Sequence, residues 1–114
     1  MIIKKLSDVP FAHLEGDDRV KKRIVLGPDD GSHEIVLRYF SIEPGGVSPQ
    51  HRHDFPHLVK IESGKGLVIG EMDNEYHLKP GDYVYIDSNE IHQLKNIGSK
   101  PFDFICIIPR RGER

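Results

Sequence analysis

The chain has 114 residues, of which 37% are hydrophobic and 30% are charged, so we expect one globular domain spanning residues 1–114. Its 18 acidic and 16 basic residues leave a formal charge of -2, so the charge gives no electrostatic case for a nucleic acid or an anionic membrane as partner. Residues 1–8 lack the pattern of a signal peptide, no apolar run approaches the length of a membrane span, and Cys106 is the single cysteine. We therefore expect a cytoplasmic protein without an intrachain disulfide.

Short runs of β-branched and aromatic residues, separated by turn residues, predict an all-β chain without a convincing helix. The first run covers 35–42 and ends at the turn sequence Glu43-Pro44-Gly45-Gly46. The second covers 57–62 and ends at Ser63-Gly64-Lys65-Gly66. Strands this short at this spacing favour an antiparallel sandwich or barrel, and we expect residues 110–114 to be solvated and frayed. The remaining predicted strands cover 67–72, 76–78, 83–86, 91–95 and 102–108.

Four histidines are the strongest functional signal in the sequence. His51, His53 and His57 lie close together after the first predicted strand, and His92 lies much later. Side chains alternate between the two faces of a strand, so the spacing puts His51 and His53 on one face, and His57 on the face of Val59 and Ile61. His92 shares a face with Leu94, and all four are expected to face the interior of one barrel. Buried imidazoles need polar partners, which one shared metal ion would supply.

The remaining histidines, His13, His33 and His77, do not follow this pattern, and we interpret them as surface or loop residues. The alternative for each of the four inward histidines is a core residue that forms a hydrogen bond. Four at these spacings favour a single mononuclear metal site. A glycine-rich phosphate loop, a Gly-x-Ser-x-Gly motif and a Cys-x-x-Cys pair are all missing from the sequence, so these chemistries have no support.

The histidine-containing segments resemble the two sequence motifs of the cupin superfamily. In the first motif, Gly45 precedes His51 and His53 at the family spacing, and Gly64 closes the motif. His57 stands where this motif usually has a glutamate. The match indicates a cupin-type double-stranded β-helix, a jelly-roll barrel, with the metal inside one mouth.

The second motif begins at Gly81 and ends at His92 and Asn96, while Asp87 and Asn89 replace its usual proline and second glycine. Two motifs in register cover most of the chain. With histidine at position 57, the chain is similar to small single-domain, four-histidine cupins that bind manganese. This resemblance implies manganese as the metal and a homodimer as the assembly. Asn96 is expected to bond the backbone or a turn, with support of His92 as the alternative.

Four neutral imidazoles leave the full positive charge of a divalent ion uncompensated, which favours Lewis-acid chemistry and anionic ligands. Imidazole suits iron, nickel, copper and zinc, whereas manganese binds most weakly in this series, so manganese rests on the resemblance alone. An octahedral ion would keep two open positions for substrate and oxygen. A tetrahedral zinc ion would have a full shell and a structural role.

Strand alternation and the resemblance together predict a mostly apolar substrate pocket beside the metal. Core packing is the alternative for each aromatic residue and a surface position the alternative for Arg38, although an inward arginine would suit an anionic substrate. For Cys106 we favour a small buried hydrophobic residue over a nucleophile or a ligand. The predicted pocket residues are Arg38, Phe40, Phe55, Phe104, Cys106 and Ile108.

The leading functional hypothesis is a mononuclear metal-dependent oxidoreductase, dioxygenase-like, that acts on a small organic substrate inside the barrel. The first alternative is a non-redox isomerase or lyase that stabilises an enolate, but the sequence offers no evident general base for it. The second is a module that binds a small molecule without turnover.

Overall fold

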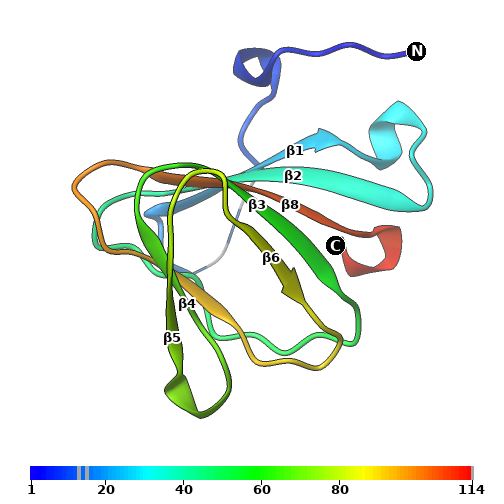
Figure 1. Cartoon of the computed structure of the whole chain (residues 1–114). Coiled ribbons are helices and arrows are strands. Elements are labelled where there is room, and N and C mark those ends of the chain that lie inside the picture. Colours follow the sequence, from blue (N-terminus) through cyan, green and yellow to red (C-terminus); the bar gives the residue numbers. More distant parts are fainter. Residues whose placement is uncertain (13, 15, 114) are drawn as a thin grey trace.

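The computed structural model describes residues 1–12, 14 and 16–113, which form eight β-strands and four single-turn 3-10 helices (Figure 1). Among these described residues, no helix is long and apolar enough to cross a membrane. The strands are β1 (Val20–Leu26), β2 (Ile35–Ile42), β3 (His57–Ser63), β4 (Gly66–Ile69), β5 (Glu75–Leu78), β6 (Tyr83–Ile86), β7 (Gln93–Asn96) and β8 (Phe102–Pro109). The 3-10 helices are η1 (Leu6–Asp8), η2 (Pro28–Asp30), η3 (Glu71–Asp73) and η4 (Arg110–Gly112).

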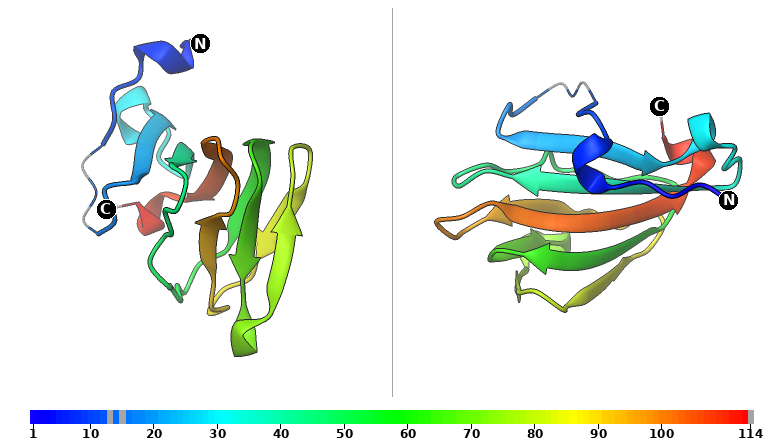
Figure 2. Two further views of the ribbon diagram at one scale, coloured as in Figure 1. Left: turned by 90° about the vertical axis from the view of Figure 1, so that its left-hand side faces the viewer. Right: turned by 90° about the horizontal axis from the view of Figure 1, so that it is seen from above.

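The strands form two antiparallel sheets, one of five strands in the order β1-β2-β8-β3-β6 and one of three strands in the order β5-β4-β7. Figure 2 shows β1, β2, β8 and β3 side by side in the larger sheet. β8 pairs with β2 over its whole length, from Phe102 opposite Ile42 to Pro109 opposite Ile35, and with β3 on its other side. The two sheets form the jelly-roll barrel that the sequence predicts.

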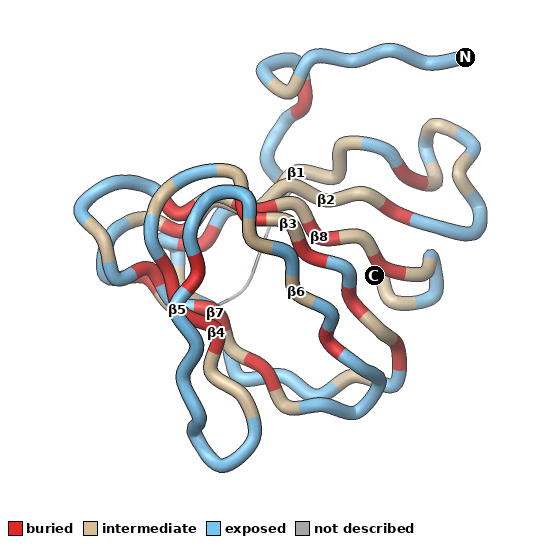
Figure 3. Tube along the Cα trace, in the orientation of Figure 1, coloured by how far each residue is buried: buried red, intermediate tan, exposed pale blue. Residues whose placement is uncertain are grey.

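Strand alternation separates the interior of the barrel from its outer surface. Along β8 every second residue is buried, beginning with Phe102, and His57, Val59 and Ile61 are the buried positions of β3 (Figure 3). Apolar side chains from both sheets fill the interior, and this burial is the main stabilising contribution. The predicted facing of both strands is therefore confirmed.

Strand β1 is an element that the sequence analysis misses. Its sequence contains three consecutive basic residues, Lys21, Lys22 and Arg23, which obscure the alternation. The structure nevertheless turns Lys22 inward beside Val20, and both side chains are buried. Lys22 can be buried because it forms an ion pair with Glu113, so the prediction of a solvated, frayed segment at 110–114 is wrong for Glu113. Arg114 lies outside the described residues.

Strand β4 ends at Ile69, three residues before the predicted boundary. The chain then turns through η3, where Met72 and Asp73 adopt φ angles of 58° and 59°. Such left-handed conformations interrupt the ladder of hydrogen bonds and begin the hairpin to β5. The predicted strand was too long because it included Met72, which is apolar but lies fully exposed in this turn.

Two glycines at the β3–β4 corner permit close contact with β8. Gly64 has φ +85°, and a Cβ there would lie 2.3 Å from the Pro101 carbonyl oxygen. A Cβ at Gly66 would lie 2.3 Å from the Phe102 ring. The closing glycine of the first motif is thus required both by its conformation and by the packing of this corner.

The Asn96 side chain connects the end of β2 to the loop between β7 and β8. Its side chain is buried, and its Nδ2 donates to the carbonyl oxygens of Ile42 and Lys100, each at 2.8 Å. Its Oδ1 accepts from the Gly98 N–H at 2.8 Å. The expectation that Asn96 bonds the backbone is confirmed.

We expect Asn96→Ala to lower the free energy of unfolding by about 3 kcal/mol, because it leaves several buried backbone groups without partners. The exposed Asn74 donates one hydrogen bond to the Glu71 carbonyl, so the matched variant Asn74→Ala should lose about 1 kcal/mol or less. Urea denaturation measures both variants. Equal losses would show that Asn96 does not have this structural role.

Candidate metal centre

A reciprocal pair of backbone hydrogen bonds joins the two histidine segments. His51 N–H donates to the His92 carbonyl, and His92 N–H donates to the His51 carbonyl, both at 2.9 Å. The loop between β2 and β3, which carries His51 and His53, is thereby fixed against the residue that precedes β7. Residues far apart in the sequence come to share one wall of the barrel.

Other contacts extend this attachment on both sides. Ser48 N–H donates to the Leu94 carbonyl at 2.8 Å, and the Ser48 hydroxyl accepts from the Leu94 N–H at 2.9 Å. Gln93 Nε2 donates to the Ser48 carbonyl at 2.9 Å. At the other end, Arg52 Nη1 donates to the Asn89 carbonyl at 2.8 Å. The loop therefore follows the edge of β7 like an additional strand.

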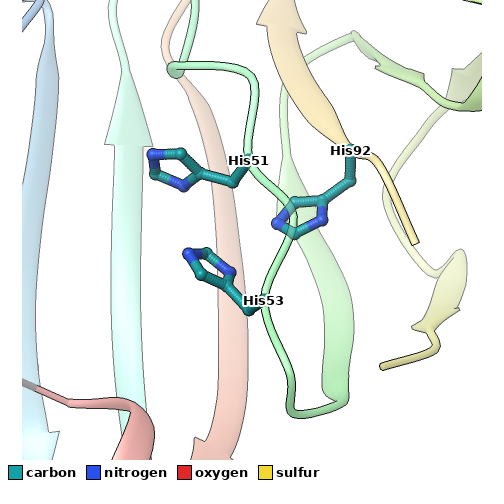
Figure 4. Close-up of side chains that lie close together, drawn as sticks. All are labelled: His51, His53 and His92. Carbon is teal, nitrogen blue, oxygen red and sulfur yellow. The ribbon is translucent and has the colours of Figure 1, made fainter. Parts of the chain in front are cut away.

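Three histidines converge at this attachment. The potential ligand atoms of His51, His53 and His92 all lie within 4.8 Å of one another (Figure 4). Two imidazole nitrogens bound to one ion at about 2.1 Å are at most about 4.2 Å apart, so small ring movements bring all three into the range of a common ion. His92 is buried, His53 is half-buried and His51 is exposed, so the cluster lies at the mouth rather than deep in the core.

The three rings offer suitable donors for a divalent transition metal. His92 Nδ1 lies 3.0 Å from the Glu90 carbonyl, which can only accept, so Nδ1 carries the proton and Nε2 presents a lone pair. Burial lowers the pKa of His51 and of His92 below the ordinary value. Both rings are therefore neutral at neutral pH, the form that binds metal.

His57, the fourth predicted ligand, lies beside this cluster. Its side chain is 5% exposed, and its ring centroid is 4.7 Å from that of His92 and 5.2 Å from that of His53. Burial lowers the pKa of His57 to about 3, with smaller contributions from nearby His92 and Arg38. Its buried Nδ1 has no hydrogen-bond partner among the described residues. A buried polar atom of this kind is the donor that a metal would satisfy.

A cavity of about 750 Å³ opens beside the histidines. Its walls include His51, His53, His57 and His92, together with Phe40 and Phe104, whose rings stack at 5.2 Å. The cavity is large enough for a small organic molecule, and both apolar and polar side chains line it.

The structure brings five of the six predicted pocket residues to this cavity. Arg38, Phe40, Phe55, Phe104 and Cys106 lie in its walls. Ile108 does not: it is 1% exposed, lies opposite Val36 and packs into the apolar core. Alternation correctly predicts its inward direction, but it cannot show that other side chains fill the barrel at that level.

Sequence reasoning missed the buried ion pair of the cavity wall, Lys22 with Glu113. Lys22 Nζ lies 2.8 Å from Glu113 Oε2, and Arg38 Nη1 lies 3.7 Å from Glu113 Oε1. On β1, the two-residue spacing of Val20 and Lys22 could have indicated that both side chains point inward. No sequence pattern around Glu113 predicts that it is buried. It reaches the cavity only because η4 turns the chain back after the end of β8.

Cys106 and Arg38 contact each other on the cavity wall. Arg38 Nη2 donates to Cys106 Sγ at 3.0 Å. Burial raises the pKa of the Cys106 thiol, so the sulfur is protonated at neutral pH and is a poor nucleophile or ligand. His33 and His77 are exposed and away from the site, as predicted for both, whereas His13 lies outside the described residues.

Comparison with known proteins identifies the fold family. A family model described as a cupin domain matches residues 38–108, which is more than half of the chain. Auxin-binding protein 1 of Arabidopsis thaliana is 26% identical over 118 residues, covering 96% of this chain and 59% of that protein. The chain spans 21% to 59% of the lengths of the curated relatives that it matches.

Solved structures share the same architecture. The polyketide cyclase RemF from Streptomyces resistomycificus superposes with a TM-score of 0.89 at 21% identity, covering 96% of this chain and 79% of that one. A Thermotoga maritima protein described as a predicted oxalate decarboxylase gives a TM-score of 0.83 at 19% identity, covering 96% and 99%. At these identities the likeness establishes the fold alone.

The lowered pKa of His57 has a consequence for the stability of the metal-free protein. The unfolded chain binds this proton near pH 6.5 and the folded protein only near pH 3, so stability falls as the pH drops below 6.5. We expect His57→Leu to remove about 2 kcal/mol of the loss between about pH 7 and pH 5. Urea denaturation at both pH values measures it. An exposed control, His33→Leu, should keep the full loss, and an unchanged loss in His57→Leu would contradict the assignment.

Proposed function

The chain belongs to the cupin family, and from this premise we propose that it is a mononuclear metal-dependent oxidoreductase, dioxygenase-like, acting on a small organic substrate. The observation that carries the proposal is the group of three histidine ligand atoms within 4.8 Å at the wall of a 750 Å³ cavity. Metal and substrate would thus be held side by side.

In this proposal His51, His53 and His92 hold the ion and His57 is its fourth ligand. Support for His57 comes from its buried, unpartnered Nδ1 and from the closeness of its ring to that of His92. All four side chains come from backbone that is hydrogen-bonded into the barrel, which keeps the donors in place before the ion binds. The Glu90 carbonyl holds the His92 ring in the tautomer that presents Nε2 inward.

A bound divalent transition metal would supply Lewis acidity and, if redox-active, a means of activating oxygen. Manganese is the metal that the family resemblance favours, and iron, nickel, copper and zinc also suit imidazole donors. An ion held by three or four of these imidazoles could keep coordination positions open for exogenous ligands. That arrangement suits a reaction in which substrate and oxygen are held together.

The cavity walls would bind and orient the substrate. The stacked rings of Phe40 and Phe104 offer an apolar surface, and Phe55 stands beside His53 with its ring centroid 4.8 Å away. These aromatic side chains exclude water from the apolar part of a ligand. The basic side chains Lys22 and Arg38 on the same wall favour an anionic ligand.

A non-redox, metal-dependent reaction of the isomerase or lyase class is the second candidate. The names of two structural neighbours, a polyketide cyclase and a predicted oxalate decarboxylase, favour it. Neutral histidine ligands would leave the ion's positive charge available to stabilise an enolate. A binding protein without turnover is the third candidate, and the name of Auxin-binding protein 1 favours it.

We also propose that the chain forms a homodimer through the outer face of the larger sheet. A row of apolar side chains crosses that face in register, with Leu58 opposite both Tyr85 and Ile107, and Leu37 opposite Ile107. Leu58 is 52% exposed and Tyr85 is 60% exposed. A second copy of the same face would cover this row and form the homodimer that the family resemblance implies.

We expect the purified protein to carry about one redox-active metal ion per chain and His92→Ala to lose most of it. Removing a ligand should weaken binding more than about 100-fold, since loss of an outer-shell partner alone costs about 10–100-fold. Elemental analysis by mass spectrometry measures the content, and His77→Ala is the exposed control. Stoichiometric zinc would contradict the oxidoreductase and favour the second candidate. Failure to bind any metal after reloading would contradict the metal site itself.

The homodimer predicts that Leu58→Lys weakens self-association at least about tenfold, because it buries an unpaired charge in the interface. Sedimentation velocity at several protein concentrations measures this. Tyr76→Lys, an exposed aromatic position on the smaller sheet, should associate like the unmodified chain. A monomeric unmodified chain at micromolar concentration would contradict the proposed assembly.

A further inference from the structure

A carboxylate from the protein itself occupies the basic side of the cavity. After β8 the chain turns through η4 and inserts Glu113 between Lys22, at 2.8 Å, and Arg38, at 3.7 Å. The three side chains are only 9%, 12% and 7% exposed for Lys22, Arg38 and Glu113. Lys22 comes from β1 and Arg38 from β2, so two neighbouring strands direct their positive charges at one point.

These charges are not balanced within the group. Two buried cations face one carboxylate, and charges taken from water need partners. Arg38 uses Nη2 on the Cys106 sulfur, a weak acceptor, while its buried Nε has no hydrogen-bond partner among the described residues. Glu113 Oε1 likewise lacks a hydrogen bond. The guanidinium therefore has donor capacity left for a second anionic group.

The other charged residues of the cavity wall do not compete for this role. Asp17 pairs with Arg19, and Arg52 faces Glu71 outside the cavity. Asp54 is 81% exposed at its side chain and pairs with Arg111. Lys22 and Arg38 are thus the cations available to a ligand inside, and Arg38 is near enough to contribute to the lowered pKa values of His51, His57 and His92.

Other contacts also hold the segment that carries Glu113. Arg110 N–H donates to the Glu34 carbonyl at 2.9 Å, and the Arg111 guanidinium donates to the Asp54 carbonyl at 3.3 Å. The Arg111–Asp54 pair at 3.3 Å is largely exposed, and exposed ion pairs contribute little. Gly112 packs against Phe55, where a Cβ would come within 2.6 Å of the ring. The ion pairs with Lys22 and Arg38 hold the Glu113 carboxylate itself, so a stronger competitor for these two cations would displace that carboxylate.

We propose that Lys22 and Arg38 form a carboxylate-binding subsite, that Glu113 fills it as an internal substitute, and that a small organic carboxylate displaces Glu113 when it enters the cavity. The two oxygens of a carboxylate match the fork of donors on a guanidinium. The stacked Phe40 and Phe104 rings would contact its apolar part. The identification of this carboxylate as the substrate rests on the proposed function, whereas the subsite itself needs no metal.

Calorimetric titration of the metal-free protein with benzoate, and with the neutral benzamide, tests this proposal. We expect Glu113→Gln to bind benzoate at least about tenfold more tightly than the unmodified chain, because the internal competitor has lost its charge. Affinity for benzamide should not change. The gain should disappear in Glu113→Gln combined with Arg38→Met, and the exposed control Glu75→Gln should bind like the unmodified chain.

Gly112→Ala gives an independent variant in case Glu113→Gln fails to fold. It should push the segment off Phe55, leave both cations intact and raise benzoate affinity in the same direction. The proposal is overturned if neither variant gains affinity, or if the gain survives the loss of Arg38.

Repeating the titration with metal added separates this proposal from the proposed function. Benzoate binding that needs added metal and His92 would place the carboxylate on the ion, overturning the subsite while supporting the metal site. Tight metal-free benzoate binding by a chain that never takes up metal would support the subsite and overturn the metal function.

Discussion

The His51–His92 backbone pair is the interaction on which the site depends. His51 and His53 lie on a loop without a full strand pairing of its own, and two reciprocal hydrogen bonds position that loop against the start of β7. Ser48 continues the attachment toward Leu94. A metal site tolerates little displacement of its donors. The backbone hydrogen bonds between this loop and the start of β7 therefore matter more for the position of the donors than the histidine side chains do. The rings converge because the backbone beneath them is fixed.

The second constraint is charge inside a small cavity. Burial lowers the pKa of His51, His57 and His92, so these rings are neutral donors. The charge inside the cavity comes from Lys22, Arg38 and Glu113. Taking such groups out of water is costly, and the ion pairs and the thiol contact of Arg38 offset only part of that cost. An interior with this composition favours ligands that bring negative charge with them. Positive charge directly beside the stacked rings, with Arg38 5.0 Å from the Phe40 ring centroid, also restricts how such a ligand can lie.

Much of the fold follows from two-residue periodicity. The predicted strands 35–42 and 83–86 match β2 and β6, and the inward direction of His57 and His92 is confirmed, because each lies in a short alternating run with clear turn residues. β1 could not be found in the same way, since the partner that permits Lys22 to be buried lies near the other end of the chain. Alternation gives the direction of Ile108 but not its depth in the barrel. Alternation also cannot predict how a side-chain ring is rotated. It therefore could not show that the ligand atoms of His51, His53 and His92 form one group while His57 lies beside it.

The central place of β8 in the larger sheet affects how this protein is made. β2 and β3 each keep one open edge until β8 inserts between them, and β8 follows the seven other described strands in the chain. A nascent chain therefore carries two unpaired, β-prone edges until β8 has been made, and exposed edges are templates for aggregation. Pairing over such a long sequence separation is also slow. Production of this protein should thus respond to chaperone supply and to growth temperature more strongly than the small size of its barrel would suggest.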